Sequence, residues 1–230
     1  MAPDTKQSLG ILNLERGQPV PPRPSGFLNP ATYDFPIIVE TVEGAWADRV
    51  IRGDPTLEPN YIAAARRLVE RGAIAISSNC GFSIRHQEAV AASVNVPVAM
   101  SSLLLLPSLL RQLPPSAKIA VVTADSTYCG EDLLGVNDAA ERARIVIGGI
   151  EGGKFWENEM KRPTPLTAIV DIETDVASCV ARLRARHPQI ATILFECTAF
   201  PVVASAMRRI TGLPIYDITT LCRMTFASVA

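Results

Sequence analysis

The chain contains an internal repeat, and this feature restricts its possible folds more than any other. Each copy has a short apolar run, a cysteine, a helix-like stretch and a second apolar run that contains a proline. Pro97 lies 17 positions after Cys80, and Pro214 lies 17 positions after Cys197. Two copies with the same spacing predict a duplicated strand–helix–strand unit in which each cysteine lies at the carboxyl end of a strand.

Short apolar runs and helix-period segments alternate along the chain, which predicts an α/β fold with parallel sheets. Eight runs are expected to be strands, at residues 9–14, 36–40, 73–77, 97–100, 118–123, 144–150, 190–195 and 214–216. Six helices are expected at residues 60–71, 84–94, 102–113, 167–186, 201–211 and 219–227. Segments 19–30 and 152–165 are rich in Pro, Gly and polar residues and are expected to be surface loops. Eight strands in a duplicated chain predict two four-stranded halves.

The five cysteines fall into two groups. We interpret Cys129, Cys179 and Cys222 as small buried residues of the core. Cys80 and Cys197 each stand between a strand end and a helix start. There, backbone N–H groups stabilise a thiolate, lower the thiol pKa and can hold a carboxylate. We therefore predict that these two thiols are a catalytic pair facing one cleft.

Composition excludes several classes of partner. Lys and Arg total 22 against 23 Asp and Glu, so no excess of positive charge is available to bind a phosphate backbone, and nucleic acid is not expected. The longest uncharged stretch, 89–110, is interrupted by Asn95, Pro97 and Pro107 and is not expected to span a membrane. An odd number of cysteines and a start at 1–10 without an apolar core favour a reducing, cytoplasmic location.

Other kinds of site lack their sequence patterns. His86 and His187 have no partners at ligand spacing, so no metal is expected. His86 lies six positions after Cys80, which leaves a Cys–His hydrolase as an alternative. Residues 148–154 have the outline of a phosphate loop, but Phe155 replaces the magnesium-binding hydroxyl and no helix is expected there. We interpret this segment as a glycine-rich turn, and no cofactor is expected.

With these features, the sequence resembles the aspartate/glutamate racemase superfamily. This superfamily works without pyridoxal phosphate and includes hydantoin racemases, maleate isomerases and arylmalonate decarboxylases. The resemblance covers nearly the whole chain. It is carried by Cys80 after the third expected strand, by Cys197-Thr198 after the seventh, and by the closing segment 213–220. Segment 121–127 takes the place of the superfamily's strand and carboxylate-binding loop.

The resemblance implies two Rossmann-like halves related by a pseudo-twofold axis, with the active site in the cleft between them. Residues 1–100 with 213–230 are expected to form the first half and residues 101–212 the second, with each last strand passed to the opposite half. It also implies a set of substrate-binding residues, which are Asn13, Asn79, Gly81, Phe82, Ser126, Thr127 and Thr198.

The implied activity is that of a cofactor-independent racemase or epimerase, an isomerase that acts on the carbon next to the carboxylate of an amino acid or related small acid. Cys80 and Cys197 exchange the roles of base and acid on opposite faces of that carbon in this mechanism. A maleate-type cis–trans isomerase, a decarboxylase and a non-catalytic small-acid-binding protein are the alternatives. The expected partner is a small carboxylic acid, and a homo-oligomer is considered as well.

Overall fold

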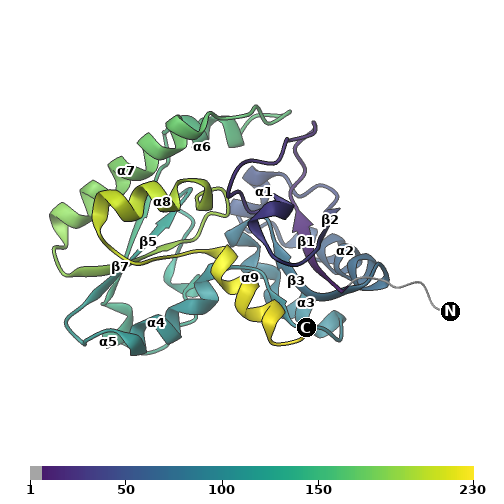
Figure 1. Ribbon diagram of the computed structural model, residues 1–230, viewed down its shortest axis with the longest axis horizontal. Coiled ribbons are helices and arrows are strands. Elements are labelled where there is room, and N and C mark those ends of the chain that lie inside the picture. The colour runs from purple at the N-terminus through teal and green to yellow at the C-terminus, as the bar shows by residue number, and fades with distance from the viewer. Residues whose placement is uncertain (1–6) are drawn as a thin grey trace.

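The structure of the protein is a computed structural model that describes residues 7–230, and it contains two parallel four-stranded β-sheets (Figure 1). The first sheet has the order β2-β1-β3-β4 and the second the order β6-β5-β7-β8. The strands are β1 (Ser8–Asn13), β2 (Ile37–Thr41), β3 (Ala73–Ser78), β4 (Val98–Ala99), β5 (Lys118–Thr123), β6 (Ile145–Gly149), β7 (Ile190–Phe195) and β8 (Ile215–Tyr216). The predicted α/β class with two four-stranded halves is confirmed.

The two sheets repeat each other in detail. Besides the shared strand order, the register of β1 against β3 shifts after Ser8, and the register of β5 against β7 shifts after Lys118. The same irregularity at the same place in both sheets means that the repeat in the sequence is also a repeat in the backbone.

Helices cover the sheets, and all six predicted ones are present. The α-helices are α1 (Ala47–Ile51), α2 (Glu58–Glu70), α3 (Gln87–Ser93), α4 (Leu106–Gln112), α5 (Ala139–Arg142), α6 (Lys154–Glu159), α7 (Ile169–Arg186), α8 (Pro201–Thr211) and α9 (Ile218–Ala227). The helices predicted at 84–94 and 102–113 begin as 3-10 turns, η3 (Gly81–His86) and η4 (Ser102–Leu105). Both turns therefore bring backbone N–H groups close to the carboxyl edge of the first sheet.

One expected loop is in fact partly a helix. Residues 152–165 were expected to lack a helix, but α6 begins at Lys154. Its sequence has no capping side chain at Gly153, and the cap comes from a distant residue instead: Asp175 of α7 accepts a hydrogen bond from the Phe155 N–H at 3.0 Å. The prediction was wrong because the group that satisfies the helix start lies 20 residues further along the chain.

The two halves exchange helices rather than strands. We expected all of residues 213–230, including their strand, to belong to the first half, but β8 pairs with β7 in the second sheet. Only α9 crosses over: it packs against β3 and β4 of the first sheet, and Figure 1 shows it apart from α8. In return, η4 crosses toward the second half, where the Ser102 hydroxyl donates to the Phe195 carbonyl at 2.6 Å. Two residues are too few to carry a strand across, whereas a whole apolar helix face can be buried on the neighbouring sheet.

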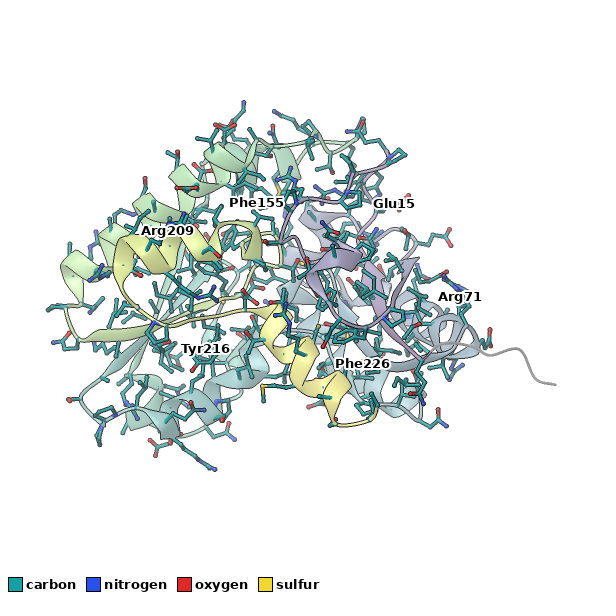
Figure 2. All side chains as sticks on the ribbon, in the orientation of Figure 1. Glu15, Arg71, Phe155, Arg209, Tyr216 and Phe226 are labelled. Atoms are coloured by element: carbon teal, nitrogen blue, oxygen red, sulfur yellow. The ribbon has the colours of Figure 1, made fainter. Side chains whose placement is uncertain are left out.

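Buried side chains of α9 and α4 join the two halves into one core. Leu221 and Phe226 of α9 belong to the same apolar cluster as Leu109 of α4 and Val121 of β5. Phe226, labelled in Figure 2, stacks on Phe35 with ring centroids 4.0 Å apart. Within residues 7–230, no helix has both the length and the apolar character that crossing a bilayer requires.

Candidate active site

The two predicted cysteines occupy equivalent turns at the carboxyl ends of β3 and β7. In the first copy, the Ser83 N–H donates to the Cys80 carbonyl at 3.1 Å, and in the second the Phe200 N–H donates to the Cys197 carbonyl at 3.2 Å. The residues before the cysteines make equivalent hydrogen bonds. The Asn79 N–H donates to a carbonyl of β1, and the Glu196 N–H donates to a carbonyl of β5. Each thiol is thus fixed by backbone hydrogen bonds at the edge where parallel sheets form ligand sites.

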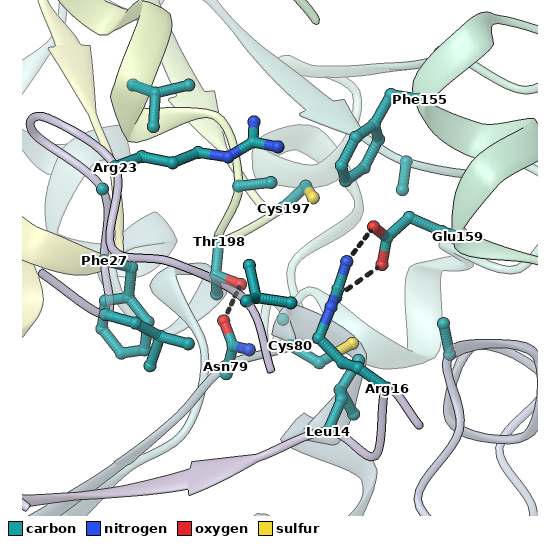
Figure 3. Close-up of a pocket in the computed structure, with 18 of the residues that line it drawn as sticks. Leu14, Arg16, Arg23, Phe27, Asn79, Cys80, Phe155, Glu159, Cys197 and Thr198 are labelled. Atoms are coloured by element: carbon teal, nitrogen blue, oxygen red, sulfur yellow. Dashed lines mark hydrogen bonds and ion pairs between the residues drawn. The ribbon is translucent and has the colours of Figure 1, made fainter. Parts of the chain in front are cut away.

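A cavity between the two halves brings both thiols together (Figure 3). Most of its lining comes from four segments: the loop after β1, within residues 14–28; the turn 79–82; α6 with its end, within residues 155–160; and the turn 196–199. The rest comes from α1, from the residue after β5 and from α8. Cys80 comes from the first half and Cys197 from the second, and Figure 3 shows both sulfur atoms at the cavity. The arrangement can present two thiols to one small molecule from different sides.

The surroundings favour the protonated form of both thiols. Burial raises the pKa of Cys80 and of Cys197 well above the usual range, and the negative charge of Glu196 is the next cause for each. The Phe82 and Ser83 N–H groups at Cys80, and that of Ala199 at Cys197, act in the opposite direction. We expected a lowered thiol pKa from the helix starts, and this was wrong because desolvation and the nearby carboxylate outweigh those N–H groups.

Glu196 is a fully buried carboxyl group on the cavity wall. Its Oε2 accepts a hydrogen bond from the Thr123 hydroxyl at 2.8 Å, and its Oε1 has no hydrogen-bond partner in residues 7–230. A Cβ atom on Gly81 would lie 2.2 Å from that Oε1, so the carboxyl group lies directly against the Cys80 turn. Burial raises the pKa of Glu196 to about 7, while the Thr123 hydrogen bond and the charge of Arg85 hold it down.

The cavity contains charges of both signs. Arg16 and Glu159 form a two-point ion pair, with Nη1 to Oε2 at 3.0 Å and Nη2 to Oε1 at 2.5 Å. Arg23 donates to the Thr167 carbonyl at 2.5 Å but makes no ion pair with any carboxylate of residues 7–230. Burial and the neighbouring Arg16 lower the pKa of Arg23, and the negative charge of Glu159 acts in the opposite direction.

The predicted substrate-binding residues divide into three groups by their position. Asn79, Gly81, Phe82 and Thr198 line the cavity. Asn13 lies behind Asn79, to which it is joined by a hydrogen bond of 2.7 Å. Ser126 and Thr127 are not among the lining residues, because Glu151 accepts hydrogen bonds from the Ser126 hydroxyl and N–H and Thr127 is exposed.

Sequence reasoning did not find the cationic and aromatic part of the cavity. These residues are Arg16, Arg23, Phe155, Trp156 and Glu159. They lie in loops and in α6, outside the repeated unit, so the repeat carried no signal for them. The signal that was available is the pair of proline-rich and glycine-rich segments, since long loops beside an α/β cleft often carry ligand contacts.

Solved structures with a similar fold include racemases and a decarboxylase. Glutamate racemase from Francisella tularensis matches 97% of the chain and 82% of its own length, with a TM-score of 0.55 and 14% identity. Aspartate racemase from Picrophilus torridus matches 93% and 89%, with a TM-score of 0.57 and 14% identity. Unliganded arylmalonate decarboxylase matches 91% and 86%, with a TM-score of 0.54 and 16% identity. The fold is therefore that of the aspartate/glutamate racemase superfamily, as predicted.

Sequence relatives identify a more specific family for the chain. A dimethylsulfoniopropionate lyase from Durusdinium sp. clade D is 30% identical over 218 residues, which are 91% of this chain and 71% of the relative. Dimethylsulfoniopropionate lyase 7 from Emiliania huxleyi is 26% identical over 237 residues, which are 96% of this chain and 67% of the relative. No family model matches the sequence. The chain belongs to the dimethylsulfoniopropionate lyase family. It is thus one of a group of enzymes, and the isomerase class expected from the sequence is not confirmed.

Proposed function

We propose that the chain is a lyase that eliminates dimethyl sulfide from dimethylsulfoniopropionate or a closely related sulfonium acid. The observation that carries this proposal is the pair of thiols, Cys80 and Cys197, on one cavity that also contains cationic and aromatic groups. The relatives named above supply the choice of substrate.

The reaction needs a base at the carbon next to the carboxylate. The thiolate of Cys80 or Cys197 removes a proton from that carbon, and the released electron pair forms the carbon–carbon double bond. The bond between the β-carbon and the sulfonium sulfur breaks, and its electrons leave with dimethyl sulfide. The products are acrylate, dimethyl sulfide and one proton, which remains on the cysteine until it is passed on.

The charges of the cavity match the two ends of such a substrate. Arg23, which has no ion-pair partner among residues 7–230, receives the carboxylate, because a guanidinium forms charge-assisted hydrogen bonds with it. The sulfonium end lies toward Phe155 and Trp156, because aromatic faces attract cations. The developing negative charge on the carboxylate is then stabilised by the same arginine that binds it.

Racemisation of a small chiral acid is the second candidate, because the two thiols come from opposite halves of the molecule. A racemase also removes the proton next to the carboxylate but returns one to the other face. The two reactions therefore differ in whether the β-substituent leaves.

The test is incubation of the protein with dimethylsulfoniopropionate in deuterated water, with gas chromatography for dimethyl sulfide and proton NMR for acrylate. We expect both products, and a loss of about 10²-fold or more in rate for Cys80→Ser and for Cys197→Ser, since a serine hydroxyl is a far weaker acid than a thiol. Cys179→Ser is the matched control, because Cys179 is buried in α7 away from the cavity. Deuterium exchange in chiral acids without any release of dimethyl sulfide would establish the racemase instead.

A further inference from the structure

The mechanism above leaves Glu196 without a role, although its position is unusual. A carboxyl group this deeply buried is normally paired, yet its Oε1 has no partner in the described part of the chain. Sequence position places it directly before Cys197, and Gly81 leaves the space in which its Oε1 lies against the Cys80 turn. The carboxyl group therefore stands between the two cysteine turns, on the cavity wall.

We propose that Glu196 exchanges a proton with the thiols of Cys80 and Cys197, so that the three groups share one negative charge. The inference deepens the proposed lyase function and rests on it for the role in turnover. Glu196 acts through the thiols, and no contact with the substrate is required of it.

Electrostatic repulsion favours a single shared charge in this site. A thiolate formed beside an ionised Glu196 places two negative charges in one desolvated site, which is strongly unfavourable. If the proton of the thiol moves to Glu196 instead, the site keeps a single charge and no further charge is buried. Among the charged groups around Cys80 and around Cys197, Glu196 has the largest effect on the pKa of the thiol. Proton exchange requires this close electrostatic coupling.

The step is balanced in protons. Thiol and carboxylate become thiolate and carboxylic acid, and the thiolate then takes the proton from the substrate carbon. Elimination leaves the cysteine as a thiol and Glu196 as a carboxylic acid, and Glu196 returns its proton to solvent through the open cavity. A lyase needs this last step because it releases one proton in each cycle, whereas a racemase returns every proton it removes.

The other groups that face Glu196 do not neutralise it. Arg85, on η3, lowers the pKa of Glu196, but its own guanidinium is joined to Asp132 at 3.1 Å and to the Tyr128 carbonyl at 2.9 Å. Cys129 also lies within range of the charge of Glu196, which adds to the effect of burial in raising its pKa. Glu159, across the cavity, acts on both thiols only weakly and is paired with Arg16.

The experiment measures the rate at which iodoacetamide alkylates Cys80 and Cys197 of the intact protein between pH 5 and 11, by mass spectrometry of the peptides that contain each cysteine. The lyase substrate is not used, so the outcome is independent of the proposed reaction. A shared charge gives the wild type two rises in rate, one near the pKa of Glu196, about 7, and one at alkaline pH. In Glu196→Gln, the first rise disappears and the rate near pH 7.5 falls about tenfold or more, while Glu196→Asp retains the first rise.

Two results would overturn the proposal. If Gln at this position leaves both rises in place, Glu196 has a structural role only, since the amide still accepts the hydrogen bond from Thr123. If the wild type shows a single alkaline rise that moves to lower pH in Glu196→Gln, the carboxylate only repels the thiolates.

A second variant keeps the proposal testable if Glu196→Gln does not fold. Thr123→Val removes the hydrogen bond that stabilises the carboxylate, so the first rise must move to higher pH. An unchanged first rise in this variant contradicts the proposal. A protein that shows both rises but releases no dimethyl sulfide retains the shared charge and rejects the lyase.

Discussion

Arg16 and Arg23, in the loop after β1, both line the cavity but differ in how far other groups neutralise their charge. Glu159 neutralises Arg16 through two hydrogen bonds, whereas within the described part of the chain the Arg23 guanidinium donates to the neutral Thr167 carbonyl. A neutral acceptor orients the guanidinium without cancelling its charge. Arg23 is therefore the cation on the wall that is prepared to bind a carboxylate.

Substitution of Arg23 tests this assignment. We expect Arg23→Met to raise KM for dimethylsulfoniopropionate about 10- to 100-fold, because a hydrogen bond to a charged group contributes about 1.5–3 kcal/mol. Arg111→Met, on the exposed side of α4, is the matched control and leaves KM unchanged. Steady-state kinetics with both variants gives the answer, and an unchanged KM in Arg23→Met means that the carboxylate binds elsewhere.

Helix α6 shows how an element outside the repeat completes the cavity. It carries Phe155, Trp156 and Glu159 on one wall, and its amino end depends on Asp175 of α7. The carboxylate of Asp175 also lies against Gly153, at the point where the helix dipole favours a negative charge. The start of the helix that carries these cavity residues is thus held by a side chain outside the cavity, while Trp156 also donates to Asp125 and Glu159 also pairs with Arg16.

Removal of this cap has a local effect. We expect Asp175→Ala to lower the free energy of unfolding by about 1 kcal/mol and to fray α6, which raises KM several-fold. Fluorescence of Trp156 in a Trp46→Phe background reports the fraying as a shift toward the spectrum of exposed tryptophan. Glu173→Ala removes a carboxylate from the same helix without touching the cap. If both variants behave alike, the cap does not hold α6 in place.

The sequence predicts some elements well for a physical reason. The central strands β1, β3, β5 and β7 are almost entirely buried and appear as continuous apolar runs, and the cysteine turns appear twice, so each copy supports the other. The sequence did not predict α6, and the expected transfer of a strand between the halves was wrong. The cap of α6 and the crossing of α9 depend on contacts between residues far apart in sequence, and no local pattern records such contacts. The prediction of a low thiol pKa was wrong for the same reason, because the carboxylate of Glu196 approaches Cys80 only in the folded chain.

The exchange of helices makes the two halves dependent on each other. Apolar residues of α9 and of α4 complete a core that continues from the first sheet to β5 and β7. Neither half keeps a closed core when the other unfolds. The molecule therefore has the packing of a single cooperative unit, although it has two sheets.

Cooperative unfolding is the prediction at this scale. Trp46 belongs to the first half and Trp156 to the second, so the variants Trp156→Phe and Trp46→Phe each leave one reporter. We expect both reporters to show the same midpoint in urea. Phe226→Ala, on α9, should lower the free energy of unfolding by about 3 kcal/mol and shift both reporters together. Met224→Ala, whose side chain is exposed on the same helix, shifts neither. Separate midpoints would show that the halves fold independently.

The duplicated turns also decide whether the site has a direction. A symmetric dimer of one such unit presents two identical turns, and whatever faces one thiol must also face the other. In a single chain the two turns differ: Asn79 precedes Cys80, and at the matching position Glu196 precedes Cys197. The amide belongs to a network with Asn13 and Thr198, whereas one oxygen of the carboxyl group has no hydrogen-bond partner in residues 7–230. Joining two copies in one polypeptide thus gives the cavity unlike ends, and unlike ends suit a reaction that runs one way over one that must treat mirror images equally.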